Sequence, residues 1–309
     1  MKRILRITFV ASIAIILAIL IFMPAPQKNI EENRPKITAS LFVGYDIARN
    51  LAQDTPIETQ LLLSPGTDLH SYEPSPQDII KIKNSDVFIY NGGESEEWLN
   101  DIISEINTNK TTIIRMMDFV DLLKEDEDED EYDEHVWTSP QNEQKIYSKI
   151  TSIISQKWPK YADIFQRNFE VQNQALSELD QAFKNLAQTK SGVIIMADRF
   201  PLRYFVETYG FDYYAAFPGC AEQTEANLKI ISELINAVEK SPTKVIFHIE
   251  LSNQAVAKTI QDATGAKILE FHSIHNISQA DFDSGKTYVD FMRQNYQNLS
   301  EALYETPVR

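Results

Sequence analysis

Short apolar runs alternate with amphipathic segments along most of the chain, and this alternation indicates an α/β protein. The runs have the length of strands, and polar or turn-forming residues bound them. They cover residues 37–43, 58–63, 86–90, 192–196, 244–250 and 266–271. Because strands that alternate with helices form mostly parallel sheets covered on both faces, we predict two lobes, each a mostly parallel sheet flanked by helices.

The stretch from residue 160 to 188 departs from this alternation. It contains neither proline nor glycine, and apolar residues such as Phe165 and Phe183 recur near helical spacing. A helix of about 26 residues measures roughly 39 Å at 1.5 Å per residue, which is longer than one small lobe. We therefore predict one long rigid helix that joins an N-terminal lobe (36–159) to a C-terminal lobe (189–309).

The first 35 residues have the pattern of an export signal or membrane anchor followed by a polar tether. Lys2, Arg3 and Arg6 precede an apolar stretch of 17 residues at positions 7–23. Basic residues ahead of such a stretch favour translocation of the chain beyond it, and its length is near the lower limit for a bilayer span. We expect an extracytoplasmic protein, in the periplasm or at the cell surface, with this segment either cleaved or kept as an anchor.

Composition limits the binding partners and the cysteine-linked bonds that we expect. The 309 residues carry a formal net charge of −16, which argues against nucleic acid and anionic lipid as partners. Much of this charge lies in an acidic run at residues 125–134, where nine of the ten side chains are carboxylates. The only cysteine, Cys220, lies far from the N-terminal segment, so we expect neither an intrachain disulfide nor a lipoprotein anchor on cysteine.

Three of the five histidines lie in polar, carboxylate-rich settings that suit a metal ion. They are His70, His135 and His272, whereas His248 lies within an apolar strand and is expected to be structural. Neutral imidazole is the commonest protein ligand for zinc-like ions, and three imidazoles with one carboxylate complete a four-coordinate shell. A single histidine is more often a hydrogen-bonded structural residue, so spacing leaves both interpretations open.

Polar residues also follow the predicted strands of the second half. Asp198, Glu250 and His272 each lie at or just past the carboxyl end of a strand. Ligands of open parallel sheets bind beyond these ends. Two such edges that face each other would form a cleft.

Four motifs carry a resemblance to a known family. They lie at residues 65–76, at 90–94 with 97–99, at 134–140, and at 285–288 with Met292, Asn295 and Leu299. With these motifs the chain resembles the solute-binding proteins of ABC importers for zinc and manganese, in which one long rigid helix joins two α/β lobes. The resemblance covers roughly Ile37 to Leu303.

The resemblance implies a ligand set. His70 and His135 match the two ligands of the N-terminal lobe. The motif of the third ligand, at residues 197–205, contains no histidine here and leaves Asp198 as the candidate.

The fourth position falls on His272, with His275 as a nearby competitor and Glu250 as a supporting residue behind the ligands. A shell of three histidines and one aspartate suits zinc better than manganese, which prefers more oxygen ligands.

The resemblance also implies a function. We expect a binding protein and not an enzyme: a monomer that captures a divalent ion, zinc or alternatively manganese, and delivers it to the permease of an ABC transporter. A zinc hydrolase, with Glu250 or Glu134 as general base, and a surface adhesin are the other interpretations; no HExxH motif supports the first. Family members carry a charged, often histidine-rich loop where this chain has its acidic run, so weak cation capture by the run is a further hypothesis.

Overall fold

The computed structural model describes residues 34–125, 131–189, 192–217 and 227–304. The chain divides into two units, Met1–Arg34 and Pro35–Arg309, and the architecture below is that of the second unit. The predicted signal or anchor segment, Cys220 and the middle of the acidic run lie outside the described residues. Within the described ranges, no helix combines the length and apolarity needed to cross a membrane.

The N-terminal lobe is a four-stranded parallel sheet with the order β2-β1-β3-β4. Its elements are β1 (Lys36–Ala39), α2 (Phe42–Leu51), β2 (Glu58–Leu61), α3 (Pro76–Lys83), β3 (Val87–Tyr90), a short 3-10 turn (Glu94–Glu96), α4 (Leu99–Ser104) and β4 (Thr112–Arg115). The three strands predicted in this half are confirmed, and the structure adds β4. The Ser75 hydroxyl accepts a hydrogen bond from the backbone N–H of Asp78, and the Asp78 carboxylate accepts one from that of Ser75. This capping box fixes the start of α3 just after the loop that carries His70.

The C-terminal lobe repeats the arrangement with the strand order β6-β5-β7-β8, again all parallel. Its elements are β5 (Ile194–Met196), α7 (Arg203–Tyr209), β6 (Tyr213–Ala215), α8 (Leu228–Lys240), β7 (Val245–His248), α9 (Ala255–Thr264), β8 (Lys267–Glu270), α10 (Gln279–Asp283) and α11 (Tyr288–Leu303). The three predicted strands are confirmed. The edge strand β6 was not predicted, because it has three residues and two of them, Tyr213 and Tyr214, are exposed.

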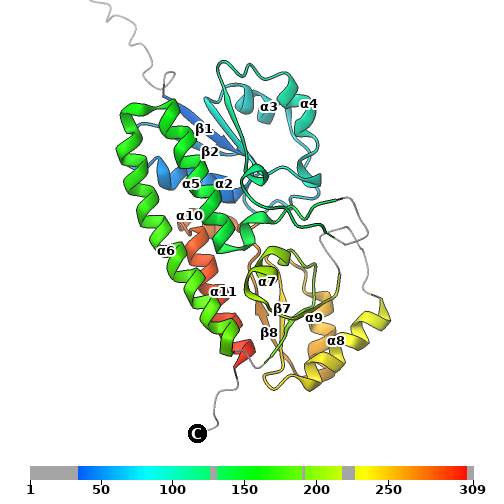
Figure 1. The fold of residues 1–309 in the computed structure, drawn as a ribbon. Coiled ribbons are helices and arrows are strands. Elements are labelled where there is room, and N and C mark those ends of the chain that lie inside the picture. The colour runs from blue at the N-terminus through cyan, green and yellow to red at the C-terminus, as the bar shows by residue number, and fades with distance from the viewer. Residues whose placement is uncertain (1–33, 126–130, 190–191, 218–226, 305–309) are drawn as a thin grey trace, which may run out of the picture. The chain divides into compact units, whose positions relative to one another are not determined.

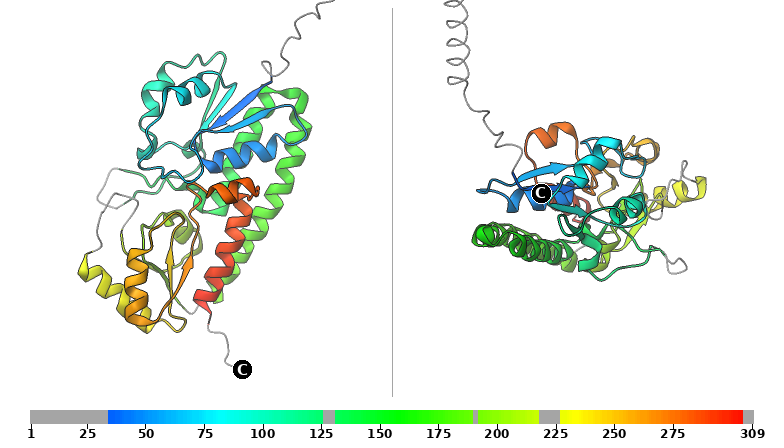
Figure 2. Two further views of the ribbon diagram at one scale, coloured as in Figure 1. Left: turned by 180° about the vertical axis from the view of Figure 1, so that it is seen from behind. Right: turned by 90° about the horizontal axis from the view of Figure 1, so that it is seen from above.

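One long helix, α6 (Ala162–Thr189), connects the lobes, and helix α5 (Pro140–Lys157) precedes it and packs on it. The chain passes from β4 through 3-10 turns at Met116–Phe119 and Val136–Thr138 into α5, then through a turn at Pro159–Tyr161 into α6. Helix α6 has 28 residues and packs against α5, against α2 of the first lobe and against α7 and α11 of the second. Figure 1 shows it running alongside both lobes, and Figure 2 shows α11 beside it from behind. The predicted fold class, two lobes joined by one long helix, is confirmed.

One apolar core extends through both lobes and the long helices. It includes Ile37 of β1, Phe183 of α6, Phe247 of β7 and Leu303 of α11, all with no exposed surface. The Phe183 ring meets the ring of Phe205 edge-on at a centroid distance of 4.9 Å. Because protein interiors are close-packed and resist deformation, this shared core restricts movement of one lobe relative to the other.

Replacing Phe183 with alanine is therefore expected to lower the free energy of unfolding by about 3–5 kcal/mol, since the cavity lies where α6 meets the second lobe. Urea denaturation measures this change. Val171→Ala is the matched control on the same helix, because Val171 is 65% exposed and its truncation should change stability by less than about 0.5 kcal/mol. Equal effects of the two substitutions would contradict this account of the core.

Candidate metal centre

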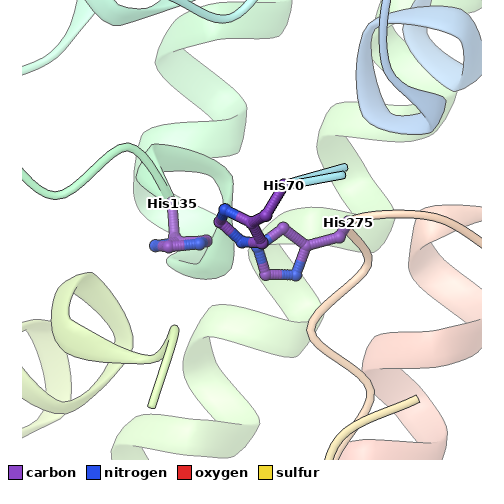
Figure 3. Close-up of side chains that lie close together, drawn as sticks. All are labelled: His70, His135 and His275. Atoms are coloured by element: carbon purple, nitrogen blue, oxygen red, sulfur yellow. The ribbon is translucent and has the colours of Figure 1, made fainter. Parts of the chain in front are cut away.

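Three histidines from three loops meet between the lobes. His70 lies between β2 and α3, His135 precedes the Val136–Thr138 turn, and His275 lies between β8 and α10. One ring nitrogen from each can be chosen so that all three nitrogens lie within 4.8 Å of one another. Figure 3 shows the three rings converging from separate segments. The ring centroids are 4.4 Å apart for His135 and His275 and 5.6 Å apart for His70 and His275.

The backbone N–H of each of these histidines donates a hydrogen bond to a carboxylate. The partners are Asp68 for His70 (2.9 Å), Asp133 for His135 (2.8 Å) and Glu250 for His275 (3.1 Å). In the first two cases an aspartate two residues earlier closes a local turn, which is a frequent role for this residue type. The sequence around the two N-terminal-lobe histidines therefore sets the local backbone conformation that presents each ring.

Acidic groups also face the Nδ1 atoms of the first two rings. Nδ1–H of His135 donates to Asp133 Oδ1 at 2.8 Å. Nδ1 of His70 lies 2.9 Å from the hydroxyl oxygen of Ser95, and that hydroxyl donates to Glu134. A serine hydroxyl has one hydrogen, so Ser95 accepts the proton of His70 Nδ1–H while it donates to the carboxylate. Both rings then have their lone pair on Nε2.

His275 is held in the same way. Its Nδ1 contacts the Ser273 hydroxyl, which donates to Glu250 Oε1 at 2.6 Å. Metal-binding histidines almost always give their other N–H to a carboxylate, a carbonyl or water, which fixes the tautomer and the ring orientation. All three rings therefore have the tautomer that a metal ion at Nε2 requires.

These imidazole rings are largely buried. His135 is 2% exposed and His275 8%. The Nε2 atom of His70 is buried and has no hydrogen-bond partner among the described residues. Buried polar atoms are rarely left unsatisfied, and an ion is one of the groups that satisfies them.

His272, the predicted fourth ligand, lies outside this group of three, whereas its competitor His275 lies within it. The His272 ring packs on the Phe291 ring at a centroid distance of 4.0 Å, and its Nδ1 accepts the backbone N–H of Ile274 at 3.0 Å. Asn295 fixes the backbone of His272 with two hydrogen bonds: its Oδ1 accepts the N–H of His272, and its Nδ2 donates to the carbonyl oxygen of His272. The chain then turns at Ile274, whose φ is 66°, a conformation that β-branched residues rarely adopt. The turn brings the next residue, His275, to the centre.

Asp198 follows β5 as predicted but is not part of the group of three. Its Oδ1 accepts the backbone N–H of Arg199 at 2.9 Å, and its Oδ2 is buried without a hydrogen-bond partner among the described residues. Its assignment as a ligand stays a prediction.

Glu250 lies behind His275 and is 8% exposed. Burial alone would raise the pKa of its carboxyl, but nearby His272 and His275 and hydrogen bonds from His275 and Ser273 together lower the pKa below its usual range. The carboxylate therefore keeps its charge in the interior, where it favours a cation at the adjacent imidazoles.

The two faces of the centre differ in access. His70 and His135 contribute to the wall of a cavity of about 760 Å³ formed by the N-terminal lobe. Its acidic lining residues are Glu94, Glu96, Glu97, Glu125, Glu131 and Glu134. On the other side, between His70 and His275, the space is only about 20 Å³, and an ion pair of 2.9 Å between Asp68 and Arg199 joins the lobes beside it. The open side thus carries negative charge, which favours cations over anions.

Glu96 is the most deeply buried carboxyl in that cavity wall, with 3% exposure. Its Oε2 accepts the backbone N–H groups of Asn91 and Gly92 at 2.8 and 2.7 Å. Burial nevertheless raises the pKa of Glu96 to about 7, with a smaller contribution from the charge of Glu134.

The raised pKa of Glu96 predicts a pH dependence of stability. The folded protein keeps the proton up to about pH 7, whereas the unfolded chain releases it near the ordinary glutamate pKa of 4.5, so stability should fall as the pH rises through this window. The loss amounts to about 3 kcal/mol at most. In Glu96→Gln, whose amide oxygen can still accept both backbone hydrogen bonds, this loss should disappear.

Chemical denaturation of the metal-free protein between pH 5 and pH 8 tests this expectation. Glu97→Gln is the control, because the neighbouring side chain is exposed and its substitution should leave the pH dependence as in the wild type. The same slope in wild type and Glu96→Gln would contradict it.

The fold and the site define a class of protein: a rigid two-lobed binding protein with a candidate metal centre between its lobes. Residues 37–302 match the family described as "Zinc-uptake complex component A periplasmic" (ZnuA), and the chain belongs to this family.

Similar proteins match most of this chain. The zinc-binding lipoprotein AdcA of Streptococcus pneumoniae (strain ATCC BAA-255 / R6) is 25% identical over 283 residues, which make up 87% of this chain and 56% of AdcA. The chain thus spans about half the length of that relative. The high-affinity zinc uptake system protein ZnuA of Bacillus subtilis (strain 168) is 23% identical, over 86% of this chain and 87% of the relative. The crystal structure of the Zn(II)-bound ZnuA-like domain of S. pneumoniae AdcA superposes with a TM-score of 0.74 at 24% identity, covering 88% of this chain and 99% of that domain.

Proposed function

We propose that the protein captures one divalent metal ion outside the membrane, with zinc as the preferred cargo, and delivers it to the permease of an ABC transporter. The observation that carries this proposal is the group of three imidazoles, His70, His135 and His275, each with its Nδ1 engaged and its backbone N–H held by a carboxylate. The names of the relatives AdcA and ZnuA support zinc as the cargo and uptake as the process.

The donor set favours zinc over manganese. Zinc commonly binds three histidines with a fourth ligand, whereas manganese is better served by carboxylate, carbonyl and water oxygens. We assign His275 to the ligand position for which His272 was predicted. Asp198 remains our candidate for the fourth ligand, because its buried Oδ2 is without a hydrogen-bond partner among the described residues.

The interlobe contacts support binding without a wide hinge movement. The backbone N–H of Gly66 donates to Ile277 O at 2.8 Å, and the Asn276 side chain donates to Ser64 O and Thr67 O at 2.7 and 2.8 Å. The loops of His70 and His275 are thereby tied to each other beside the centre. With the shared core along α6, this favours uptake and release by local loop movement, during which the metal competes with protons for the imidazoles.

The proposal includes the location and the partners. An exported protein, guided by the N-terminal segment, would meet its permease at the outer face of the membrane, and we propose that it acts as a monomer without nucleic acid partners. An uptake component is required for growth when zinc is scarce, whereas an adhesin is not, so deletion of the gene followed by growth at limiting zinc separates these two functions. Hydrolysis of ester substrates by the zinc-loaded protein would indicate an enzyme.

Zinc-loaded protein is expected to contain one zinc per chain, and manganese in tenfold excess should not displace it, because the centre offers three nitrogen ligands. Elemental analysis after dialysis, followed by competition with a chromophoric chelator, measures both quantities. Displacement of zinc by manganese would show that manganese is the preferred cargo. If neither metal binds tightly, the proposed function is wrong.

The choice between His275 and His272 is tested by a matched pair of alanine substitutions. His275→Ala should weaken zinc binding by more than about 100-fold, since even partners of metal ligands change affinity by 10–100-fold when removed. His272→Ala should change it by less than about tenfold, because that ring packs on Phe291 outside the group. Competition titrations at one pH compare the two variants; the reverse order of effects would restore His272 as the ligand.

A further inference from the structure

One helix of the C-terminal lobe reaches across to the segment that carries His135. Tyr204, in the first turn of α7, is 2% exposed, and its hydroxyl makes two hydrogen bonds to the N-terminal lobe. It accepts the backbone N–H of Leu123 at 3.1 Å and donates to Asp133 O at 2.9 Å. The phenol thus both donates and accepts, in each case with a residue of the opposite lobe.

Leu123 and Asp133 pair with each other on either side of residues 124–132, and we call this pair the base of the acidic run. The backbone N–H of Asp133 donates to Leu123 O at 2.9 Å, and Lys124 and Tyr132 form an antiparallel bridge just beyond them. Tyr204 therefore joins the two sides of this base at a single hydroxyl.

Asp133 continues the connection to the metal centre. Its Oδ1 accepts both the backbone N–H and the Nδ1–H of His135, each at 2.8 Å, and both side chains are 2% exposed. The path from Tyr204 to the ring of His135 therefore contains one intervening residue, and that residue sets both the position and the tautomer of the ring.

Helix α7 makes a second contact with this segment at Ser139, which follows His135 in the sequence as Asp133 precedes it. The hydroxyl oxygens of Thr208 and Ser139 are 2.9 Å apart, within hydrogen-bond distance. Helix α7 also packs on the Val136–Thr138 turn between these contacts. It therefore holds the His135 segment at Asp133 and at Ser139. The loops of His70 and His275, by contrast, are tied to each other through Asn276.

We propose that Tyr204 is a positioning residue of the metal centre, which holds His135 in place from the opposite lobe through Asp133. Loss of the two Tyr204 hydrogen bonds releases Asp133, and His135 then loses its support before the other two histidines, whose loops are tied to each other. This inference rests on the proposed function, because it assigns a step of metal release to that same centre.

The test compares two tyrosines of the same helix. Tyr204→Phe removes the hydroxyl that holds Asp133, whereas Tyr209→Phe removes a buried hydroxyl that donates to Asp180 on α6 at 3.1 Å. Tyr204→Phe is expected to weaken zinc binding about tenfold, the lower end of the range for partners of metal ligands, mainly through faster dissociation. Its cobalt(II)-loaded form should show a shifted visible spectrum, because the geometry at His135 changes. Tyr209→Phe should lower thermal stability but leave zinc affinity and the cobalt spectrum as in the wild type.

A double-mutant cycle with Asp133→Asn separates positioning from general stability. If Tyr204 acts through Asp133, the effects of the two substitutions on zinc affinity are less than additive. Thr208→Val removes the polar contact of α7 with Ser139, and it should also shift the cobalt spectrum if Tyr204→Phe does not fold.

Wild-type zinc dissociation and a wild-type cobalt spectrum in folded Tyr204→Phe would overturn the inference, and so would equal effects of Tyr204→Phe and Tyr209→Phe on zinc binding. If only Thr208→Val folds, a wild-type cobalt spectrum in that variant overturns it as well. Failure of the wild-type chain to bind zinc would instead overturn the proposed function.

Discussion

Three imidazoles from two lobes lie within reach of one ion because a single apolar core extends along α6 and fixes the lobes in relation to each other. The core includes side chains of β1 in the first lobe and of β7 and α11 in the second, packed with those of α6. An ion held from both sides of a cleft needs ligand positions accurate to fractions of an ångström. With a flexible connection, the ion itself would have to bring the histidines into position. The shared core instead holds them in position before an ion binds.

The carboxylates behind the histidines have two physical effects. They engage the Nδ1 atoms, directly at Asp133 and through serine hydroxyls at Glu134 and Glu250, so the lone pairs lie on Nε2. They also place negative charge close to the centre, where reduced solvent screening strengthens its attraction for a cation. The same carboxylates therefore orient the three imidazoles and favour a positive charge beside them.

Much of the fold was predictable because it depends on local patterns. The six predicted strands and the long helix are apparent from the periodicity of apolar residues, and all of them are present. The strands β4 and β6 were missed: the apolar run within β4 is only two residues long, Ile113 and Ile114, and β6 has two exposed tyrosines. Strands with so weak an apolar pattern are defined by their pairing with a neighbour, and a pattern along one segment contains no record of that neighbour.

The sequence by itself determined the two-lobed α/β architecture, the connecting helix and the two histidines that follow an aspartate by two residues, His70 and His135. These features depend on apolar periodicity and on turns closed within three residues. Only the tertiary structure decided which histidine of the last loop joins them. Asn295 on α11 holds the backbone of His272, and the left-handed turn at Ile274 directs His275 inward. Both contributions come from the way the loop packs on distant segments, which residue spacing along the chain does not encode.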